Sequence, residues 1–415
     1  MDARFAVLPV ASPAPDVATS LHHEEALSDI IADYAEQLAD LGGMIVDRAH
    51  LEEAPLVVFV LTGGTERTIL DVWEERGGTA EPLLLLTHPG QNSLPAALEA
   101  LARVRQLGGH GRILYLRGQC DADCFAAIDD AVHDVETHTR LQATRIGIVG
   151  DPSDWLVASS PDPKTVQAAW GPHLVDIPLR KLYQGYAGSS DDALALEIIG
   201  SSDGSMVEAA AVGEAVDVLT ALKGVVEEEQ LDSVSVRCFD VVNDLGTTAC
   251  LALSQLNDEG LIAGCEGDVV STVAMLWARE LINVTPWMAN PARIDEDAGT
   301  LLLAHCTVPR GLVETYGLST HFESKIGVGI AGEVPAGDVT LIRIGGSNME
   351  ELWLQEGEIV RGARDDDLCR TQAHVLLGPD PIRQLLTEPL GNHIVLVPGH
   401  HAARLRAWWE MFIAA

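Results

Sequence analysis

Basic residues are scarce in this sequence. It has 26 Lys and Arg against 62 Asp and Glu, a formal net charge of −36, and its lysines are Lys164, Lys181, Lys223 and Lys325. Such a surface repels phosphate backbones and anionic lipids, so we expect neither a nucleic-acid nor a membrane partner. The acidity also suits a surface solvated in concentrated salt. Salt adaptation and plain compositional bias both remain open as its cause.

Long hydrophobic runs are absent as well. No stretch approaches the roughly 18 apolar residues that a membrane-spanning helix needs. The N-terminus, MDARFAVLPV, lacks the basic flank and long apolar core of a signal peptide. We therefore expect a soluble, cytoplasmic protein.

The cysteines show no zinc-type spacing. Cys120 and Cys124 are separated as on a helix, and no second pair accompanies them, so we expect them to be structural. Cys238, Cys250 and Cys265 lie inside apolar runs, as reduced core thiols do. Dinucleotide-binding and P-loop glycine spacings are also missing.

The order of apolar runs predicts the fold. At roughly 150 residues per domain, 415 residues make two or three domains. Strand and helix patterns alternate through the first half of the chain, which predicts two doubly wound parallel-sheet domains of the Rossmann or flavodoxin type, 1–142 and 143–230. Many short strands in 231–415 predict a mixed α/β C-terminal domain containing a β-barrel. Within it, 285–294 resembles a loop.

Residues 233–276 contain one pattern twice, a strand that ends at an acidic residue and is followed by a helix. In the first copy Asp240 follows the strand, 243–246 resembles a turn, and Thr247 or Thr248 is expected to cap the helix. In the second copy Glu266 and Asp268 end the strand. If the two strands are parallel neighbours, these acids meet at one edge of a sheet.

Clustered carboxylates repel one another and raise each other's pKa, so they need a bound cation or a shared proton, and a divalent cation is the favoured explanation. Asp240, Glu266 and Asp268 are therefore candidates, and His305, His321 and His393 lie beside apolar strand runs further along the chain. Carboxylates with one imidazole suit Mn²⁺, with Mg²⁺ or Co²⁺ as substitutes. Two alternatives stay open: the acids are helix N-caps, and each histidine is a hydrogen-bonded core residue.

Several segments resemble the L-fucose isomerase/L-arabinose isomerase superfamily, in particular its short prokaryotic fucose isomerase-like members. They are CFDVVNDLGTTACLALSQLND, AGCEGDVVSTVAML, LAHC, THFES, CRTQ and PLGNHIVLVPG, which fall between about 230 and 400. The resemblance implies a metal-dependent aldose–ketose isomerase that acts on a sugar through an enediol. It also implies a homo-oligomer, a trimer or a hexamer.

By resemblance, the metal is Mn²⁺ held by Asp240, Asp268 and His393, and Asp240 and Asp268 also transfer protons. Glu266 competes with Asp268 for the second acidic position. Asp240 departs from the family pattern, in which a longer Glu stands at this place. The expected substrate contacts are His305, His321, Arg370, Gln372 and Asn392.

Two other functions fit the same residues. One is a sugar sensor that binds without turnover, and the other is a different enediolate enzyme, such as an aldol-type lyase or an epimerase. The sequence does not decide between a free sugar and a sugar phosphate, because no phosphate-binding motif stands out.

Overall fold

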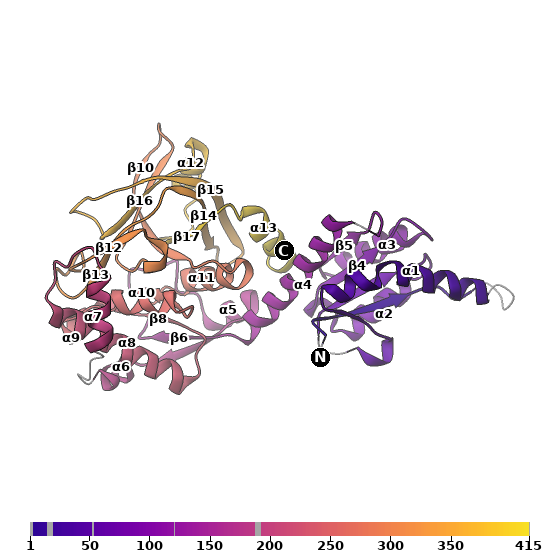
Figure 1. The fold of residues 1–415 in the computed structure, drawn as a ribbon, viewed down its shortest axis with the longest axis horizontal. Helices are drawn as coiled ribbons and strands as arrows, with labels where there is room; N and C mark the ends of the chain where they lie inside the picture. Colours follow the sequence, from indigo (N-terminus) through magenta and orange to yellow (C-terminus); the bar gives the residue numbers. More distant parts are fainter. Residues whose placement is uncertain (1–2, 15–19, 52–53, 120, 187–191, 415) are drawn as a thin grey trace. The chain divides into compact units, whose positions relative to one another are not determined.

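A computed structural model describes residues 3–14, 20–51, 54–119, 121–186 and 192–414 (Figure 1). The chain divides into two compact units. One contains Met1–Thr139 with Trp408–Ala414, and the other contains Arg140–Ala407.

The first unit is built on a parallel sheet with strand order β2-β1-β3-β4-β5. Its strands β3 and β4 are buried along their whole length, which explains their unbroken apolar sequences LVVFV and LLLLT. Separate apolar clusters cover the two faces of the sheet. Its elements are β1 (Phe5–Val10), α1 (Ser20–Asp40), β2 (Gly43–Ile45), η1 (Arg48–His50), β3 (Leu56–Val60), α2 (Glu66–Glu75), η2 (Gly78–Ala80), β4 (Leu83–Thr87), α3 (Ser93–Gln106), β5 (Gly111–Tyr115) and most of α4 (Ala122–Ala143).

The second unit begins with another parallel sheet, of order β7-β6-β8-β9. The strands predicted before Asp240 and Glu266 are β8 and β9, and they are parallel neighbours as expected. Strands β6 and β7 come before residue 230 and strands β8 and β9 after it, so the expected domain edge at 230 divides one sheet. The elements are β6 (Arg145–Val149), α5 (Pro163–Trp170), β7 (His173–Ile177), α6 (Leu179–Gly185), α7 (Asp192–Gly200), α8 (Ala209–Glu229), β8 (Ser233–Val236), α9 (Cys238–Leu245), α10 (Cys250–Asp258), β9 (Ile262–Cys265) and α11 (Val269–Ile282).

The rest of the second unit is a closed antiparallel barrel of order β10-β11-β16-β15-β14-β17, beside a ribbon of β12 and β13. The predicted fold class, parallel α/β sheets followed by a barrel, is thus confirmed. The elements are β10 (Trp287–Asp295), β11 (Thr300–His305), η3 (Arg310–Leu312), β12 (Thr315–Ser319), β13 (Gly329–Glu333), β14 (Gly337–Gly345), β15 (Glu351–Gly362), β16 (Thr371–Leu376), α12 (Pro379–Thr387), β17 (Ile394–Pro398) and the first part of α13 (Ala402–Phe412), whose residues from Trp408 belong to the first unit.

Three local predictions were wrong. Residues 285–294 are mostly strand β10. Its Pro291 lies where the pairing with β11 is irregular, which explains the loop-like sequence. The expected turn at 243–246 is largely the end of α9, which stops at Gly246 with φ of 72°. Neither Thr247 nor Thr248 is the N-cap of α10, because that position is Ala249.

Helix α11 connects the sheet to the barrel. It packs against β8 and β9 on one side and against β14 and β17 on the other. Of its residues, Val269–Ala278 are all buried, which explains the apolar run that the sequence shows there. This packing brings the end of β9 close to the beginning of β17.

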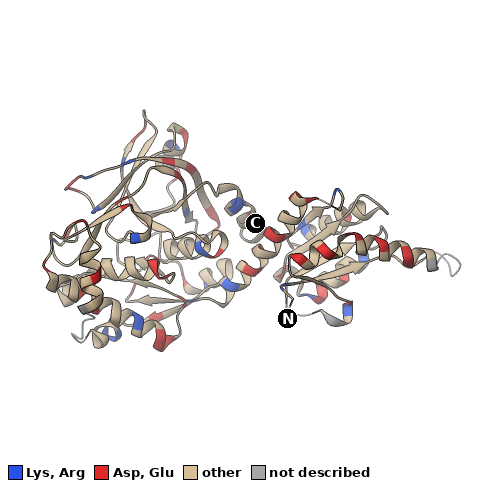
Figure 2. Cartoon of the chain, viewed as in Figure 1, with Lys and Arg blue, Asp and Glu red and all other residues tan. Residues whose placement is uncertain are grey.

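Asp and Glu positions, coloured red, are spread over the helices of both units, and the blue Lys and Arg positions are fewer (Figure 2). Among the described helices, none combines the length and the apolar composition that a membrane span requires.

Candidate active site

The candidate site forms where β6, β8 and β9 end. Val149, Val236 and Cys265 are register partners along these neighbouring parallel strands. The segments that follow them therefore leave the sheet at one edge, where α/β sheets place ligands.

The turn after β9 is tightly constrained. Glu266 has φ of 62° and Gly267 has φ of 70°. The N–H of Gly267 donates to the carbonyl of Val236, and the carbonyl of Glu266 accepts from the N–H of Ser153 at 2.9 Å. A Cβ at position 267 would lie 2.8 Å from Cα of Pro152, so only glycine fits there.

Asp268 ends this turn and begins α11. It is fully buried, and Oδ1 accepts from the N–H of Ser271 at 2.8 Å, which makes it the N-cap. The N-cap alternative is therefore correct for Asp268. Its Oδ2 also accepts from the hydroxyl of Ser271 and lies 2.8 Å from Nδ1 of His393.

Burial alone would raise the pKa of Asp268, but the hydrogen bond from His393 and the guanidinium charge of Arg343 outweigh burial, so that its pKa is lowered. The carboxylate is thus an acceptor only, and Nδ1 of His393 must carry the proton. In the neutral form of the ring, this bond selects the tautomer whose Nε2 carries a lone pair.

That lone pair faces a second acid. Nε2 of His393 lies 3.8 Å from Oε1 of Glu266, is buried, and has no hydrogen-bond partner among the described residues. His393 itself has φ of 56°, in the left-handed region. Two electron-rich atoms facing each other at this separation leave room for a cation or a donor between them.

Arg343 supports the arrangement from the barrel. It is 2% exposed, although it is a charged residue of strand β14. Its guanidinium donates to the hydroxyls of Ser271 and Ser159, at 3.0 and 2.7 Å, and to the carbonyl of His393. Arg343 therefore ties the start of α11 to the segment that carries His393.

Aromatic residues extend the site away from Glu266. The indole N–H of Trp155 donates to Oε2 of Glu266 at 2.6 Å. Trp155 packs edge to face with Phe239, with ring centroids 5.1 Å apart, and Phe239 in turn lies 5.6 Å from His321.

His305 and His321 are both buried near this cluster. The ring of His305 lies 5.6 Å from that of His393, and its Nδ1 is 2.7 Å from the hydroxyl of Thr307. Burial lowers the pKa of His305 well below its usual value, and the charges of His393 and His321 lower it further. Burial, with Arg370 and Lys325 adding to it, lowers the pKa of His321 to about 4.

A second carboxyl group faces the same region. Burial, and then the negative charge of Glu266, raise the pKa of Glu323. Its Oε2 is also 3.7 Å from Nε2 of His321.

Asp240 is placed differently from the other predicted acids. It lies in the first turn of α9, and its carboxylate accepts from Nε of Arg237 at 3.0 Å. None of its described contacts is with Glu266, Asp268 or His393. Because α9 begins at Cys238, Asp240 is a helical residue and not the end of a strand.

The remaining predicted contacts form local hydrogen bonds. Arg370 donates to the carbonyl of Thr320 at 2.8 Å and lies over the ring of Phe322. Gln372 is 2% exposed and holds the loop before β16 through the carbonyls of Asp365 and Cys369. Asn392 is bonded to Asn290.

Sequence reasoning missed Trp155 and Arg343 as members of this cluster. A single Arg inside the apolar strand sequence DVTLIRIG was a usable signal, because a buried charge needs partners. Trp155 follows the end of β6, but nothing local connects it to Glu266, 111 residues away.

The structural cysteine prediction is met where it is described, since Cys124 is buried, while Cys120 lies outside the described residues.

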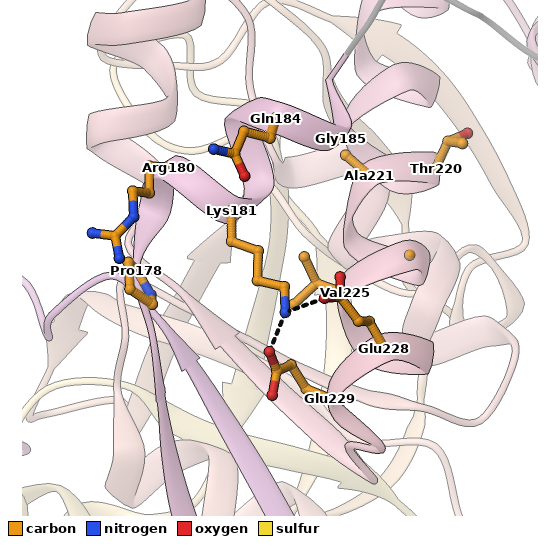
Figure 3. A pocket seen from close by; sticks show the side chains of 11 residues that line it. Pro178, Arg180, Lys181, Gln184, Gly185, Thr220, Ala221, Val225, Glu228 and Glu229 are labelled. Carbon is orange, nitrogen blue, oxygen red and sulfur yellow. Dashed lines mark hydrogen bonds and ion pairs between the residues drawn. The ribbon is translucent and has the colours of Figure 1, made fainter.

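One cavity of the second unit shares no residue with this cluster. A cavity of about 740 Å³ lies between α6 and α8, where Lys181 forms ion pairs with Glu228 and Glu229 (Figure 3).

The predicted metal ligands fit an ion only in part. Asp268 is engaged by Ser271 and His393, and Asp240 by Arg237, whereas Glu266 and His393 present free atoms to one another. In the described part of the chain, no three side chains of His, Cys, Asp and Glu are gathered as a ligand set. Glu266 and His393 would therefore supply two ligands to an ion, and water or substrate oxygens would have to supply the others.

The protein thus combines parallel α/β sheets with a closed barrel, and carboxylates and histidines gather at one edge of the second sheet. A scan against models of known protein families finds no match. The chain is 27% identical to the sulfoquinovose isomerase of Priestia aryabhattai over 220 residues, 49% of this chain and 48% of that protein. It is 23% identical to that of Alkalicoccus urumqiensis over 223 residues, 51% and 50% of the two chains. It thus matches about half the length of these curated relatives.

The lowered pKa of His321 gives a testable pH dependence. With a folded pKa of about 4 and an ordinary unfolded one, the unfolded state binds more protons between these values, so stability falls as pH decreases through this window. The slope from this group is about 1.4 kcal/mol per pH unit. We expect His321→Asn to flatten the curve of unfolding free energy against pH between about 6.5 and 4, measured by urea denaturation. Parallel curves for the two proteins would contradict the assignment.

Proposed function

We propose that this protein is an aldose–ketose isomerase whose reacting centre lies between Glu266 and His393. The observation that carries the proposal is the approach of Oε1 of Glu266 to Nε2 of His393, 3.8 Å apart, because Nε2 is buried and has no hydrogen-bond partner among the described residues. The relatives' name, sulfoquinovose isomerase, supports the same reaction type.

Isomerisation moves a proton between adjacent carbons of the open-chain sugar. In the proposed reaction, Oε1 of Glu266 removes the C2 proton of the aldose and returns it to C1 of the enediolate. The proton of the C2 hydroxyl passes to the C1 oxygen, so that C2 becomes the carbonyl carbon and C1 carries the new hydroxyl. Asp268 fixes the histidine tautomer, and Arg343 fixes the backbone that carries it.

Glu266 and His393 would hold the divalent ion, for which we propose Mn²⁺. When bound, such an ion polarises the sugar carbonyl and stabilises the enediolate charge. In this proposal Asp268 orients His393 and is not itself a ligand, since metal-binding histidines usually donate their second ring N–H to a carboxylate.

The proposed substrate carries an anionic group, as sulfoquinovose does with its sulfonate. Support comes from two cations in an otherwise acidic protein. Nζ of Lys325 lies 4.4 Å from the ring centre of Phe322, and Cζ of Arg370 lies 5.8 Å from the same centre. Lys325 is exposed and lies near His321, which is the last ring of the series Trp155, Phe239 and His321. A sulfonate or phosphate there is favoured by charge.

The function is tested by assaying purified protein for ketose formation by NMR. We expect conversion of sulfoquinovose, loss of conversion after chelation, and recovery with Mn²⁺ because the ion completes the site. A parallel panel of 6-deoxyhexoses, pentoses and sugar phosphates defines the substrate class. Sugar binding without conversion in the Mn²⁺-loaded protein would favour a sensor, and no conversion across the panel would refute the isomerase.

Two acid variants separate the proposed roles. Glu266→Gln removes the proton acceptor but keeps an oxygen for Trp155, and we expect kcat to fall by about 10²- to 10⁴-fold. Asp268→Asn retains a good N-cap residue but disturbs the tautomer of His393, and we expect a smaller loss of about 10- to 100-fold. Thermal unfolding shows whether either variant is misfolded. If Glu266→Gln retained full turnover, the proton-transfer role would be wrong.

The anion site is tested at Lys325. We expect Lys325→Met to raise KM for the sulfonated sugar about tenfold, because one charge-assisted contact of about 1.5–3 kcal/mol is weakened at an exposed position. KM for an uncharged sugar of the panel should not change. Lys223→Met is the matched control, since Lys223 pairs with Glu259 elsewhere in the unit. Equal effects on charged and uncharged sugars would remove Lys325 from the substrate site.

A further inference from the structure

Trp155 differs from the other large aromatic residues of its unit. Its side chain is 52% exposed, whereas Trp170, Trp277 and Trp287 are fully buried. It lies in the segment that follows β6, at the edge of the sheet where Glu266 also lies. An indole half in solvent and half against a buried acid needs an explanation beyond core packing.

The segment carrying Trp155 grips the Glu266 turn in three ways. The indole N–H donates to Oε2 of Glu266, the N–H of Ser153 donates to its carbonyl, and Pro152 lies so close that position 267 has no space for a Cβ. The segment that follows β6 therefore contacts the side chain of Glu266, its backbone and the neighbouring Gly267.

These contacts divide the two oxygens of the carboxylate. Oε2 is occupied by Trp155 at 2.6 Å, and Oε1 is left facing His393 at 3.8 Å. Without the indole N–H, the carboxylate could rotate, and neither oxygen would have a fixed direction. The backbone of Glu266 is already in the left-handed region, so the orientation of this residue is specified at both ends.

The indole is half exposed while its N–H is bonded to Glu266. Phe239 packs edge to face against Trp155, with an angle of 88° between the rings, and so fixes its plane. A rigid aromatic surface beside a carboxylate is the arrangement that holds the apolar face of a sugar ring while a polar group engages its hydroxyls.

We propose that Trp155 is a positioning residue for Glu266 and that its exposed indole is the surface against which the sugar ring packs. The inference rests on the proposed isomerase function, and it adds the residue that aligns the acid with the substrate. Sugar binding then depends on the exposed ring of Trp155, and the alignment of Glu266 depends on its indole N–H.

Two substitutions separate these parts. Trp155→Phe keeps an aromatic surface and loses the N–H, so we expect kcat to fall about 10- to 100-fold with KM nearly unchanged. Trp155→Ala loses both, so we expect a similar fall in kcat together with a KM about tenfold higher. Val157→Ala is the control, because Val157 is 91% exposed and lies two residues further along. Thermal unfolding of all three variants checks the fold.

A double-mutant cycle gives a readout that a purely structural role would not move. If Trp155 acts through Glu266, the losses in kcat from Trp155→Phe and Glu266→Gln should not multiply in the double variant. Fully multiplicative losses, or wild-type kcat in Trp155→Phe, would overturn the positioning role. Wild-type KM in Trp155→Ala would overturn the sugar surface.

Sugar binding distinguishes failure of this inference from failure of the function. Calorimetric titration of the sugar that binds best into wild type, Trp155→Ala and Val157→Ala requires no turnover. Weaker binding in Trp155→Ala alone supports the sugar surface even if the wild type converts nothing. Equal binding in all three refutes it even if the wild type is an isomerase, and an absence of sugar binding by the wild type refutes both.

Discussion

The bond between Asp268 and His393 is the interaction on which the site depends. It joins the first residue before α11 to the residue before β17, so the parallel sheet and the barrel meet at one buried pair. Because both groups are fully buried, neither would be stable there alone. The bond also decides which nitrogen of His393 is free, and thus what chemistry that edge of the sheet can perform.

The polar groups around this pair are hydrogen-bonded to one another. Ser271 supplies an N–H and a hydroxyl to Asp268, and Arg343 supplies further donors around the same atoms. Buried networks of this kind are rigid when every member is bonded, and here the described exception is Nε2 of His393. That exception points at Glu266, so the unsatisfied atom lies where a ligand would be used and not at a random place in the core.

The sequence predicted the scaffold better than the site. Period and apolar runs were sufficient for the two parallel sheets, for the neighbours β8 and β9, and for the barrel, because burial determines those patterns. Asp240 was predicted to follow the strand, but it lies inside α9. The residue pattern alone does not show that the strand ends at Val236 and that a helix begins at Cys238. Trp155 and Arg343 were missed because their partners are 111 and 75 residues away and depend on tertiary packing.

Backbone strain adds an independent argument for the location of the site. Glu266 and His393 both have φ near +60°, where a residue with a Cβ is disfavoured by about 1 kcal/mol or more. Asn or Gly at either position would relieve that cost if only the fold mattered. These two strained residues nevertheless are the ones whose side chains face each other. Contacts from other segments fix each of them, through Ser153 and Trp155 for the acid and through Asp268 and Arg343 for the imidazole. Strain held in place on both sides of one gap is expected where orientation matters more than local stability, and this favours a reacting centre over a structural ion pair.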